Sequence, residues 1–318
     1  MNIHPEKREP IPVCKSCYKN AQDDIIPEGY PATCKICGAD YKTHDVGQVL
    51  CASCIDKTAN TNKCPRCYGD MDKQYNCRIC EAELIPSWKT QIRDRFKTRY
   101  YRCPTCGSLQ LHGLEWLRDA YWGDTSIRHD EGRFRRNKIV YNFLDHIMHT
   151  SFKGIDIRLL DYGSGEEAIL SSIVQKHNDR VETHNYDPYF NKMSSIPNGR
   201  FNIIMCIEVM EHLKNVDAFF EHIRSKIHRN GIVVCSTNLF MPSGPKAHTK
   251  SWSYLTPEIG QHITFWSKKS LRYMRKVIGA KKAAMVKFPS KIALEFFVFC
   301  FGASTNFIDK TFFKIELI

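Results

Sequence analysis

The distribution of cysteine constrains the fold of this chain more than any other feature. Twelve of the 15 cysteines lie before residue 107 and form six CxxC pairs, whereas Cys206, Cys235 and Cys300 stand alone. A CxxC turn directs two thiolates toward one tetrahedral ion, while a disulfide framework has no need of a uniform two-residue spacing. The pattern therefore predicts about three zinc ions. The expected ligands are Cys14, Cys17, Cys34, Cys37, Cys51, Cys54, Cys64, Cys67, Cys77, Cys80, Cys103 and Cys106.

The spacing of the pairs indicates which of them share an ion. A segment of 22 residues separates Cys80 from Cys103, and it contains the strand-like run 99–102, with a second such run at 108–111. We therefore expect a zinc ribbon over residues 71–112. The first four pairs, within residues 1–70, are separated by intervals of 16, 13 and 9 residues. These intervals permit either an interleaved cross-brace, which we favour, or two successive sites.

Apolar segments of the chain are too short to predict a membrane span. Residues 1–8 lack the apolar run of a signal peptide, and the longest apolar segment, 292–303, is interrupted by Glu295. A span needs roughly 20 apolar residues, so a buried strand or helix is expected there instead. The absence of a secretion signal and the thiol-rich composition together predict a cytoplasmic location.

Beyond the cysteine-rich part, the pattern of apolar residues changes. Residues 113–150 are expected to form a helical bridging segment, because Ile139, Phe143 and Ile147 recur at helical spacing. From 151 to 318, strand-like and helix-like segments alternate, which predicts an α/β domain with a parallel sheet and a ligand at the carboxyl ends of its strands. The expected strands are 155–162, 181–186, 201–207 and 232–236, and the expected helices are 166–177, 216–228 and one that begins after Ser267.

Two of the expected strands end in residues typical of a nucleoside-binding site. The first is followed by Asp161-Tyr162-Gly163-Ser164-Gly165, in which the glycines let the backbone approach a ligand between strand and helix. Asp187 closes the next strand, where its carboxylate can accept hydrogen bonds from both hydroxyls of a ribose.

Two further motifs follow in order, E-V-M-E-H-L at 208–213 and Q-H-I-T-F-W-S at 261–267. With these, residues 157–288 resemble the class I S-adenosylmethionine-dependent methyltransferases, and most closely the branch whose later strand ends in E-V-x-E-H-L. The resemblance implies a Rossmann-like α/β sheet, here preceded by small zinc-binding modules, and S-adenosylmethionine as cofactor. The residues implied to bind the cofactor are Asp161, Gly163 and Gly165 for the methionine and adenosyl parts, Asp187 for the ribose, and Ile207 and Glu208 at the pocket border.

The same resemblance indicates where the acceptor chemistry would take place. His262 lies in the region where this fold builds its acceptor pocket, and it is the first candidate for a base that removes a hydroxyl proton, with His212 as the second. Glu208, Glu211, His212 and His262 also resemble the metal-binding set of small-RNA terminal 2′-O-methyltransferases. In that alternative, Mg²⁺ would hold a diol of the acceptor.

Charge narrows the class of acceptor. The formal net charge is +12 with cysteine neutral, but each zinc bound by four thiolates carries about −2, so three such clusters lower the charge to about +6. Between Lys246 and Lys291 there are eleven Lys and Arg residues and one acid, Glu258. This surface is either simply solvated or attracts an anionic acceptor such as a nucleotide sugar or a phosphorylated glycan.

Three hypotheses follow for the function. The first is an enzyme that methylates an anionic small molecule or a glycan-linked acceptor, most readily at a hydroxyl. The second is an RNA methyltransferase that docks its substrate on the basic stretch 89–102 and on the surface of 246–291. The third is a non-catalytic zinc scaffold, motivated by Glu166 and Glu167, which stand where the family has a third glycine or a small residue.

Overall fold

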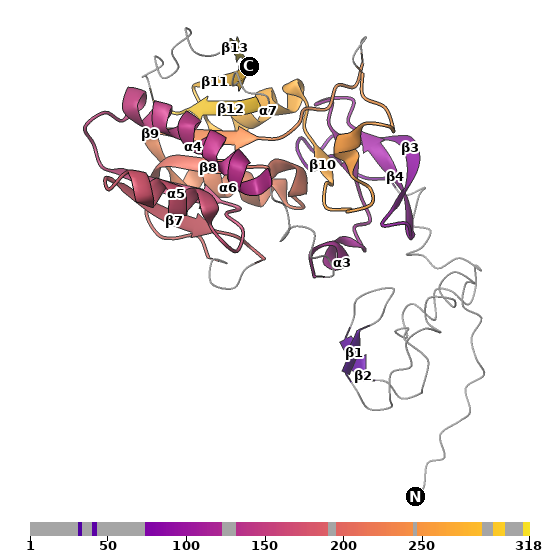
Figure 1. Cartoon of the computed structure of the whole chain (residues 1–318). Coiled ribbons are helices and arrows are strands. Elements are labelled where there is room, and N and C mark those ends of the chain that lie inside the picture. Colours follow the sequence, from indigo (N-terminus) through magenta and orange to yellow (C-terminus); the bar gives the residue numbers. More distant parts are fainter. Residues whose placement is uncertain are drawn as a thin grey trace, which may run out of the picture.

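The computed structural model describes residues 31–33, 40–42, 74–122, 132–189, 195–243, 247–287, 295–302 and 314–318 (Figure 1). Within these ranges the strands form three sheets, of two, four and seven strands. The smallest is an antiparallel pair of β1 (Pro31–Thr33) and β2 (Asp40–Lys42). Eight of the expected zinc ligands lie outside the described residues: Cys14, Cys17, Cys34, Cys37, Cys51, Cys54, Cys64 and Cys67.

The seven-stranded sheet forms the centre of the α/β region. It consists of β6 (Ile157–Tyr162), β7 (Val181–Tyr186), β8 (Phe201–Ile207), β9 (Ile227–Ser236), β11 (Lys282–Lys287), β12 (Glu295–Cys300) and β13 (Lys314–Leu317), in the order β13-β11-β12-β9-β8-β6-β7. The strands β6 to β9 are parallel, as predicted, but β11, β12 and β13 are antiparallel to their neighbours. The expected parallel sheet is therefore wrong at one edge. The segment 288–294 between β11 and β12 is too short for the crossover that parallel neighbours need.

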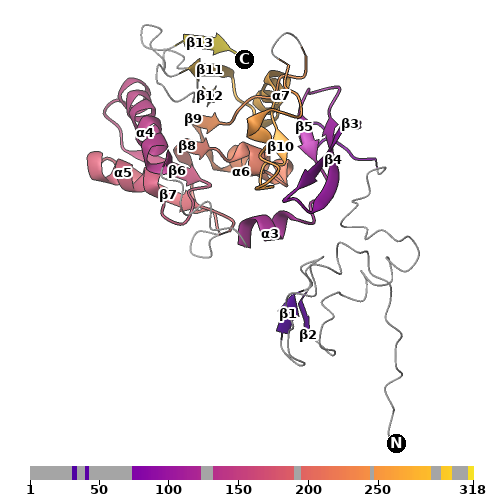
Figure 2. The same ribbon diagram turned by 45° about the vertical axis from the view of Figure 1, so that its right-hand side comes forward.

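Successive residues of the central strands point to opposite faces of the sheet, and each face packs against its own helices. In β6, Leu160 and Tyr162 belong to a buried cluster that includes residues of α6 (Val216–Lys226) and α7 (Lys268–Ile278). Their neighbour Leu159 belongs to a second cluster, with residues of α4 (Gly132–Ser151) and α5 (Ile169–His177). Figure 2 shows the two helix pairs on opposite sides of the sheet. The α/β class expected from the sequence is confirmed.

Two helices are shorter than predicted. The segment 166–177 is helical only from Ile169, because Ala168 adopts a left-handed conformation with φ of 43°. The segment 216–228 is helical only to Lys226, since β9 begins at Ile227 and pairs there with Phe201. Arg200 donates a hydrogen bond at 2.8 Å to the carbonyl oxygen of Ile227, which fixes this early start. The strand expected at 232–236 therefore begins five residues earlier.

The four-stranded sheet joins the expected zinc ribbon to the α/β region. Its strands are β3 (Ile85–Ile92), β4 (Phe96–Arg102), β5 (Leu109–Leu111) and β10 (Thr264–Phe265), in the order β10-β5-β4-β3. The last strand comes from a distant part of the chain and pairs antiparallel with β5, through Thr264 opposite Gln110 and Phe265 opposite Leu109. The indole of Trp116, just before α3 (Leu117–Trp122), fixes a further loop by donating to the carbonyl oxygen of Gly260 at 2.8 Å.

Within the apolar segment 292–303, the structure describes residues 295–302. Its described part contains β12, in which Phe296, Phe297 and Val298 are fully buried between neighbouring strands. Among the helices that the structure describes, none has the length and apolar character needed to cross a membrane.

Candidate functional site

Two groups of residues lie close together where the parallel strands end, and we name each group after its characteristic side chains. The carboxylate end consists of Asp161, Gly163, Gly165 and Asp187, which follow or close β6 and β7. The histidine end consists of Glu208, Glu211, His212, Tyr254 and His262, which lie after β8 and in the segment that leads to β10. Both groups lie on the carboxyl side of the sheet, where open α/β sheets bind ligands.

The carboxylate end holds two buried acids on neighbouring strands. Asp161 is 5% exposed and Asp187 is 7% exposed. Burial, with a contribution from the charge of Asp187, raises the pKa of Asp161 to about 7. Burial also raises the pKa of Asp187 above its usual range. Such a pair gains stability from a ligand that brings a positive charge or hydrogen-bond donors.

The glycine turn after β6 is tied directly to Asp187. The N–H of Gly165 donates to Oδ2 of Asp187 at 3.0 Å, and the N–H of Tyr189 donates to Oδ1 at 3.0 Å. Gly163 has φ of +80°, and a Cβ there would lie 2.4 Å from Cγ2 of Val209, so only glycine fits this position. The glycine thereby lets the turn pack closely against Val209.

The departure from the family pattern leaves this turn intact. Glu166 and Glu167, where a third glycine or small residue was expected, are exposed in the turn that precedes α5. Ile207, also expected at the pocket border, is the last residue of β8 and is partly buried.

Glu208 begins the histidine end in a strained conformation. Its φ of 52° lies in the left-handed region that non-glycine residues rarely adopt. Its carboxylate accepts hydrogen bonds from the Ser236 hydroxyl at 2.7 Å and from the Tyr254 hydroxyl at 3.2 Å. Burial, with a contribution from the charge of Glu211, raises the pKa of Glu208 to about 7. The strain therefore serves to place a buried carboxyl group between two hydroxyls.

Tyr254 links the parts of the histidine end. Besides its contact with Glu208, its hydroxyl donates to Oε1 of Glu211 at 2.5 Å. Its carbonyl oxygen lies 2.7 Å from Nδ1 of His262. No sequence pattern indicated this role for Tyr254 or the contact of Ser236 with Glu208, because both residues act through contacts between distant parts of the chain.

The two histidines have assignable tautomers. A carbonyl oxygen can only accept, so Nδ1 of His262 carries the proton toward Tyr254, and Nδ1 of His212 carries one toward Gln261 at 3.2 Å. In both neutral rings the lone pair is therefore on Nε2. The ring centroids are 4.9 Å apart. Burial, with a contribution from His262, lowers the pKa of His212 to about 3, so His212 stays neutral and is a weak base.

Three of the four residues considered for Mg²⁺ lie close together. Ligand atoms of Glu211, His212 and His262 lie within 4.8 Å of one another. Glu208 is not in this group, and its carboxylate accepts hydrogen bonds from Ser236 and Tyr254. Glu211 is fully buried, and its Oε2 has no hydrogen-bond partner among the described residues. Among the described residues of the histidine end, this oxygen is the one buried side-chain atom without a hydrogen-bond partner, so it could accept from a donor or bind a cation.

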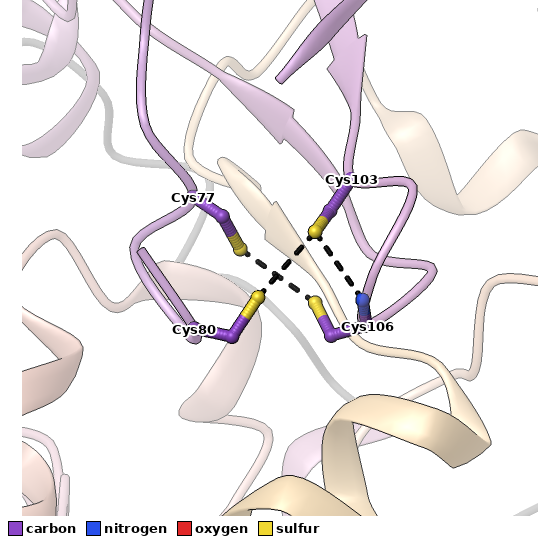
Figure 3. Close-up of side chains that lie close together, drawn as sticks. All are labelled: Cys77, Cys80, Cys103 and Cys106. Carbon is purple, nitrogen blue, oxygen red and sulfur yellow. Dashed lines mark hydrogen bonds between the residues drawn. The ribbon is translucent and has the colours of Figure 1, made fainter. Parts of the chain in front are cut away.

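The ribbon cysteines form a separate cluster. Figure 3 shows the four sulfurs of Cys77, Cys80, Cys103 and Cys106 facing one centre. The Sγ atoms of Cys77 and Cys106 are 3.6 Å apart, and those of Cys80 and Cys103 are 3.5 Å apart. A disulfide needs about 2.05 Å, whereas four thiolates about 2.3 Å from a zinc ion lie about 3.8 Å from each other. Backbone N–H groups of Ile79 and Cys106 donate to the thiolates of Cys77 and Cys103 at 3.4 and 3.3 Å.

Comparison with known proteins gives the class of the domain. A family model described as a methyltransferase domain matches residues 132–281, which contain both the carboxylate end and the histidine end. The expected methyltransferase domain is confirmed by this match. A comparison with curated proteins returned no match.

Solved structures with similar folds are distant in sequence. The plantazolicin methyltransferase BpumL in complex with SAH has 10% identity and a TM-score of 0.42, over 58% of this chain and 93% of that chain. TnmH has 10% identity and a TM-score of 0.41, over 59% of this chain and 61% of that chain. CalO1, a methyltransferase in calicheamicin biosynthesis, has 11% identity and a TM-score of 0.35, over 58% and 60%. The chain thus spans about three fifths of the length of TnmH and CalO1.

Proposed function

Starting from the methyltransferase domain at residues 132–281, we propose that this chain transfers the methyl group of S-adenosylmethionine to a hydroxyl group of an anionic small-molecule or sugar-linked acceptor. The observation that carries the proposal is the hydrogen bond at 2.7 Å between Nδ1 of His262 and the carbonyl oxygen of Tyr254. This bond leaves the lone pair of Nε2 available to take a proton from a hydroxyl.

The carboxylate end suits the polar groups of the cofactor. Each oxygen of Asp187 accepts one backbone hydrogen bond and keeps a lone pair, so the carboxylate can still receive the two ribose hydroxyls. An ionised Asp161 would attract the ammonium group of the methionine part. The cofactor's sulfonium supplies an activated methyl group, so the chain has to provide alignment and a base but no acid.

At the histidine end, His262 is the proposed base and His212 a neutral neighbour. Tyr254 holds the ring of His262 through its carbonyl oxygen and holds both glutamates through its hydroxyl. A proton taken from the acceptor would give an imidazolium close to Glu211, whose carboxylate can stabilise that charge. The exposure of Glu166 and Glu167 favours an active enzyme over the non-catalytic scaffold.

The anionic nature of the acceptor rests on the positive charge between residues 246 and 291. Part of this charge is neutralised within the chain, because Lys268 pairs with Glu316 at 2.7 Å and Lys287 pairs with Glu295 at 2.6 Å. Lys250, Arg272 and Lys276 are exposed and add a positive field around the domain. Such a field raises the local concentration of an anionic acceptor.

We also propose that Cys77, Cys80, Cys103 and Cys106 hold one zinc ion, as part of about three ions per chain. The sulfur–sulfur distances of 3.5 and 3.6 Å and the inward orientation of the four thiols support this site. Metal analysis of chain purified without chelators tests it. Cys80→Ser should contain about one zinc fewer than the wild type. A metal content near zero in the wild type, or an unchanged content in Cys80→Ser, contradicts the site.

The acceptor class is tested by methyl transfer from S-adenosylmethionine with a deuterated methyl group. The full chain is incubated with nucleotide sugars, phosphorylated oligosaccharides and single-stranded RNA, and labelled products are identified by mass spectrometry. Labelling of a hydroxyl in the first two groups is the expected result. Labelling of RNA alone, with binding that weakens steeply as salt rises, would replace the proposed acceptor by RNA. A chain that does not bind S-adenosylhomocysteine at all would contradict the methyltransferase activity itself.

A further inference from the structure

The ribbon is bonded to the segment that carries His262 through the pairing of β5 with β10 and also through the side chain of Arg78, which lies between Cys77 and Cys80. Its Nη1 donates to the carbonyl oxygen of Ile263 at 3.1 Å and to the hydroxyl of Thr264 at 3.3 Å. Its Nη2 donates to the carbonyl oxygen of Leu111. The guanidinium thus bridges β5 and the residue that follows His262.

The cysteine turn that carries Arg78 is itself held by thiolate contacts. The amide of Gln110 donates to Sγ of Cys77 at 3.0 Å, and its oxygen accepts from the backbone N–H of Arg78 at 3.1 Å. The guanidinium of Arg78 is partly buried and adjoins the cysteine cluster. A tetrathiolate zinc cluster, with its charge of about −2, would compensate the positive charge of this guanidinium.

Further hydrogen bonds join residues 263 and 264, which Arg78 contacts, to residues 211 and 213 at the histidine end. The Thr264 hydroxyl donates to the carbonyl oxygen of Leu213 at 2.9 Å, and the N–H of Ile263 donates to that of Glu211 at 2.8 Å. On the other side of the cluster, the Ser267 hydroxyl donates to the carbonyl oxygen of Cys106. Residues 261–267 are therefore held at two points by the two cysteine turns. The bonds of the carboxylate end, by contrast, join β6 to β7.

We propose that Arg78 is a positioning residue that couples metal occupancy of the ribbon to the placement of His262, so that loss of the metal disorders the acceptor side while cofactor binding persists. The inference rests on the proposed function and on one zinc ion in the ribbon. A thiol-bound metal would in this way make methyl transfer dependent on zinc supply and on the reduced state of the four cysteines.

The test compares amide hydrogen exchange in the full chain, with zinc content and affinity for S-adenosylhomocysteine measured on the same samples. Arg78→Met keeps the aliphatic stem and removes the donors. Arg102→Met is the matched control, because Arg102 also adjoins a ribbon cysteine but is exposed. We expect Arg78→Met to keep its zinc and its affinity within about twofold, while protection of the 261–267 amides falls by about tenfold. Cys80→Ser should lose one zinc and show the same local loss.

The coupling would be overturned if zinc-loaded Arg78→Met showed the same amide-exchange protection of residues 261–267 as the wild type. Loss of zinc in that variant would also overturn it, since the arginine would then be needed to build the ribbon itself. If Arg78→Met does not fold, Arg78→Lys serves for the same test. Protection of the 261–267 amides should then fall by about threefold, because the single ammonium nitrogen of lysine can replace only part of the contacts of the guanidinium. Wild-type chain that fails to bind S-adenosylhomocysteine contradicts the proposed function, and the exchange result decides the coupling independently.

Discussion

The carboxylate end and the histidine end lie on the same side of one sheet, but they are assembled differently. The first comes from two adjacent parallel strands within residues 161–187, and its hydrogen bonds join Gly165 to Asp187 and Gly163 to Tyr186. The second combines the end of β8 with residues 254 and 262 and is braced from outside by the ribbon. If the proposals above hold, cofactor binding is a property of the sheet, while acceptor chemistry depends on the added ribbon.

The largest expected effect separates the two ends at His262. His262→Ala should lower turnover by roughly 10²- to 10⁴-fold, because the base for the hydroxyl proton is lost. Affinity for S-adenosylhomocysteine should stay nearly unchanged, since the contacts at Asp187 remain. Steady-state rates and calorimetry measure the two quantities. His177→Ala, which removes an exposed imidazole on α5, is the control.

Other results for the His262 variants would assign a different role to the histidine end. If His262→Asn restores most of the activity, the residue holds the segment through its hydrogen bond to Tyr254 and is not the base. If turnover requires added Mg²⁺, and both His262→Ala and Glu208→Ala lose metal affinity, the histidine end binds a metal-chelated diol instead. Near-wild-type turnover in His262→Ala would leave no functional role for it.

The next largest effect is expected at Asp187, where a substitution should weaken cofactor binding at the carboxylate end and leave the histidine end unchanged. Asp187→Ala removes an acceptor of ribose hydroxyls and two backbone contacts, so binding of S-adenosylhomocysteine should weaken by about 2 kcal/mol, roughly 30-fold. Asp187→Asn should also be impaired, because its amide group would face the N–H of Gly165 or Tyr189. Calorimetry with Asp179→Ala as an exposed control tests this. Unchanged affinity in Asp187→Ala would mean that the ribose binds elsewhere.

The pH dependence of cofactor binding tests the role of Asp161 at the carboxylate end. With the pKa of Asp161 at about 7, its carboxyl group is mostly protonated at pH 6 and mostly ionised at pH 8. Only the ionised form attracts the ammonium group of the cofactor, so affinity should rise with pH, by up to about tenfold across this range. Asp161→Asn should flatten the profile. An affinity that falls as pH rises would contradict the placement of the ammonium group.

The two glycines of the turn provide the smallest expected effect. Ala at Gly163 would meet Cγ2 of Val209 at 2.4 Å, whereas a Cβ at Gly165 meets no atom within 4 Å. Both positions have a positive φ, so both substitutions carry the same backbone cost. Gly163→Ala should therefore be less stable than Gly165→Ala by about 1 kcal/mol or more in denaturant unfolding. Equal stabilities would mean that Val209 moves aside without cost.

The proximity of the carboxylate-end residues could be predicted from the sequence because its determinants are local. A buried strand, a turn with two glycines and an acid at the next strand end lie within 27 residues, from Asp161 to Asp187. The extents of β7 and β8 were also predicted correctly; β8 is a mostly apolar run, FNIIMCI, whereas β7, VETHNY, is polar between its two apolar ends. The pairing of Cys77 and Cys80 with Cys103 and Cys106 also followed from regular spacing.

The histidine end could be predicted only in part. His212 and His262 were found from motifs, but the contacts of Tyr254, Ser236 and Arg78 depend on long-range packing that no local pattern records. The early start of β9 and the antiparallel edge are likewise set by partner strands. The two-residue strand β10 is too short for any periodic signal, although it joins the ribbon to the domain.

The central claim, that the turn after β6 binds the cofactor, is tested most directly by selective ¹⁵N-glycine labelling. The chain has 17 glycines, so the spectrum is simple, and the Ala variants assign Gly163 and Gly165. Titration with S-adenosylhomocysteine should shift these two signals with a common saturation curve, while Gly107, beside the ribbon cysteines, stays in place. Signals of Gly163 and Gly165 that do not move at saturating ligand would contradict the account.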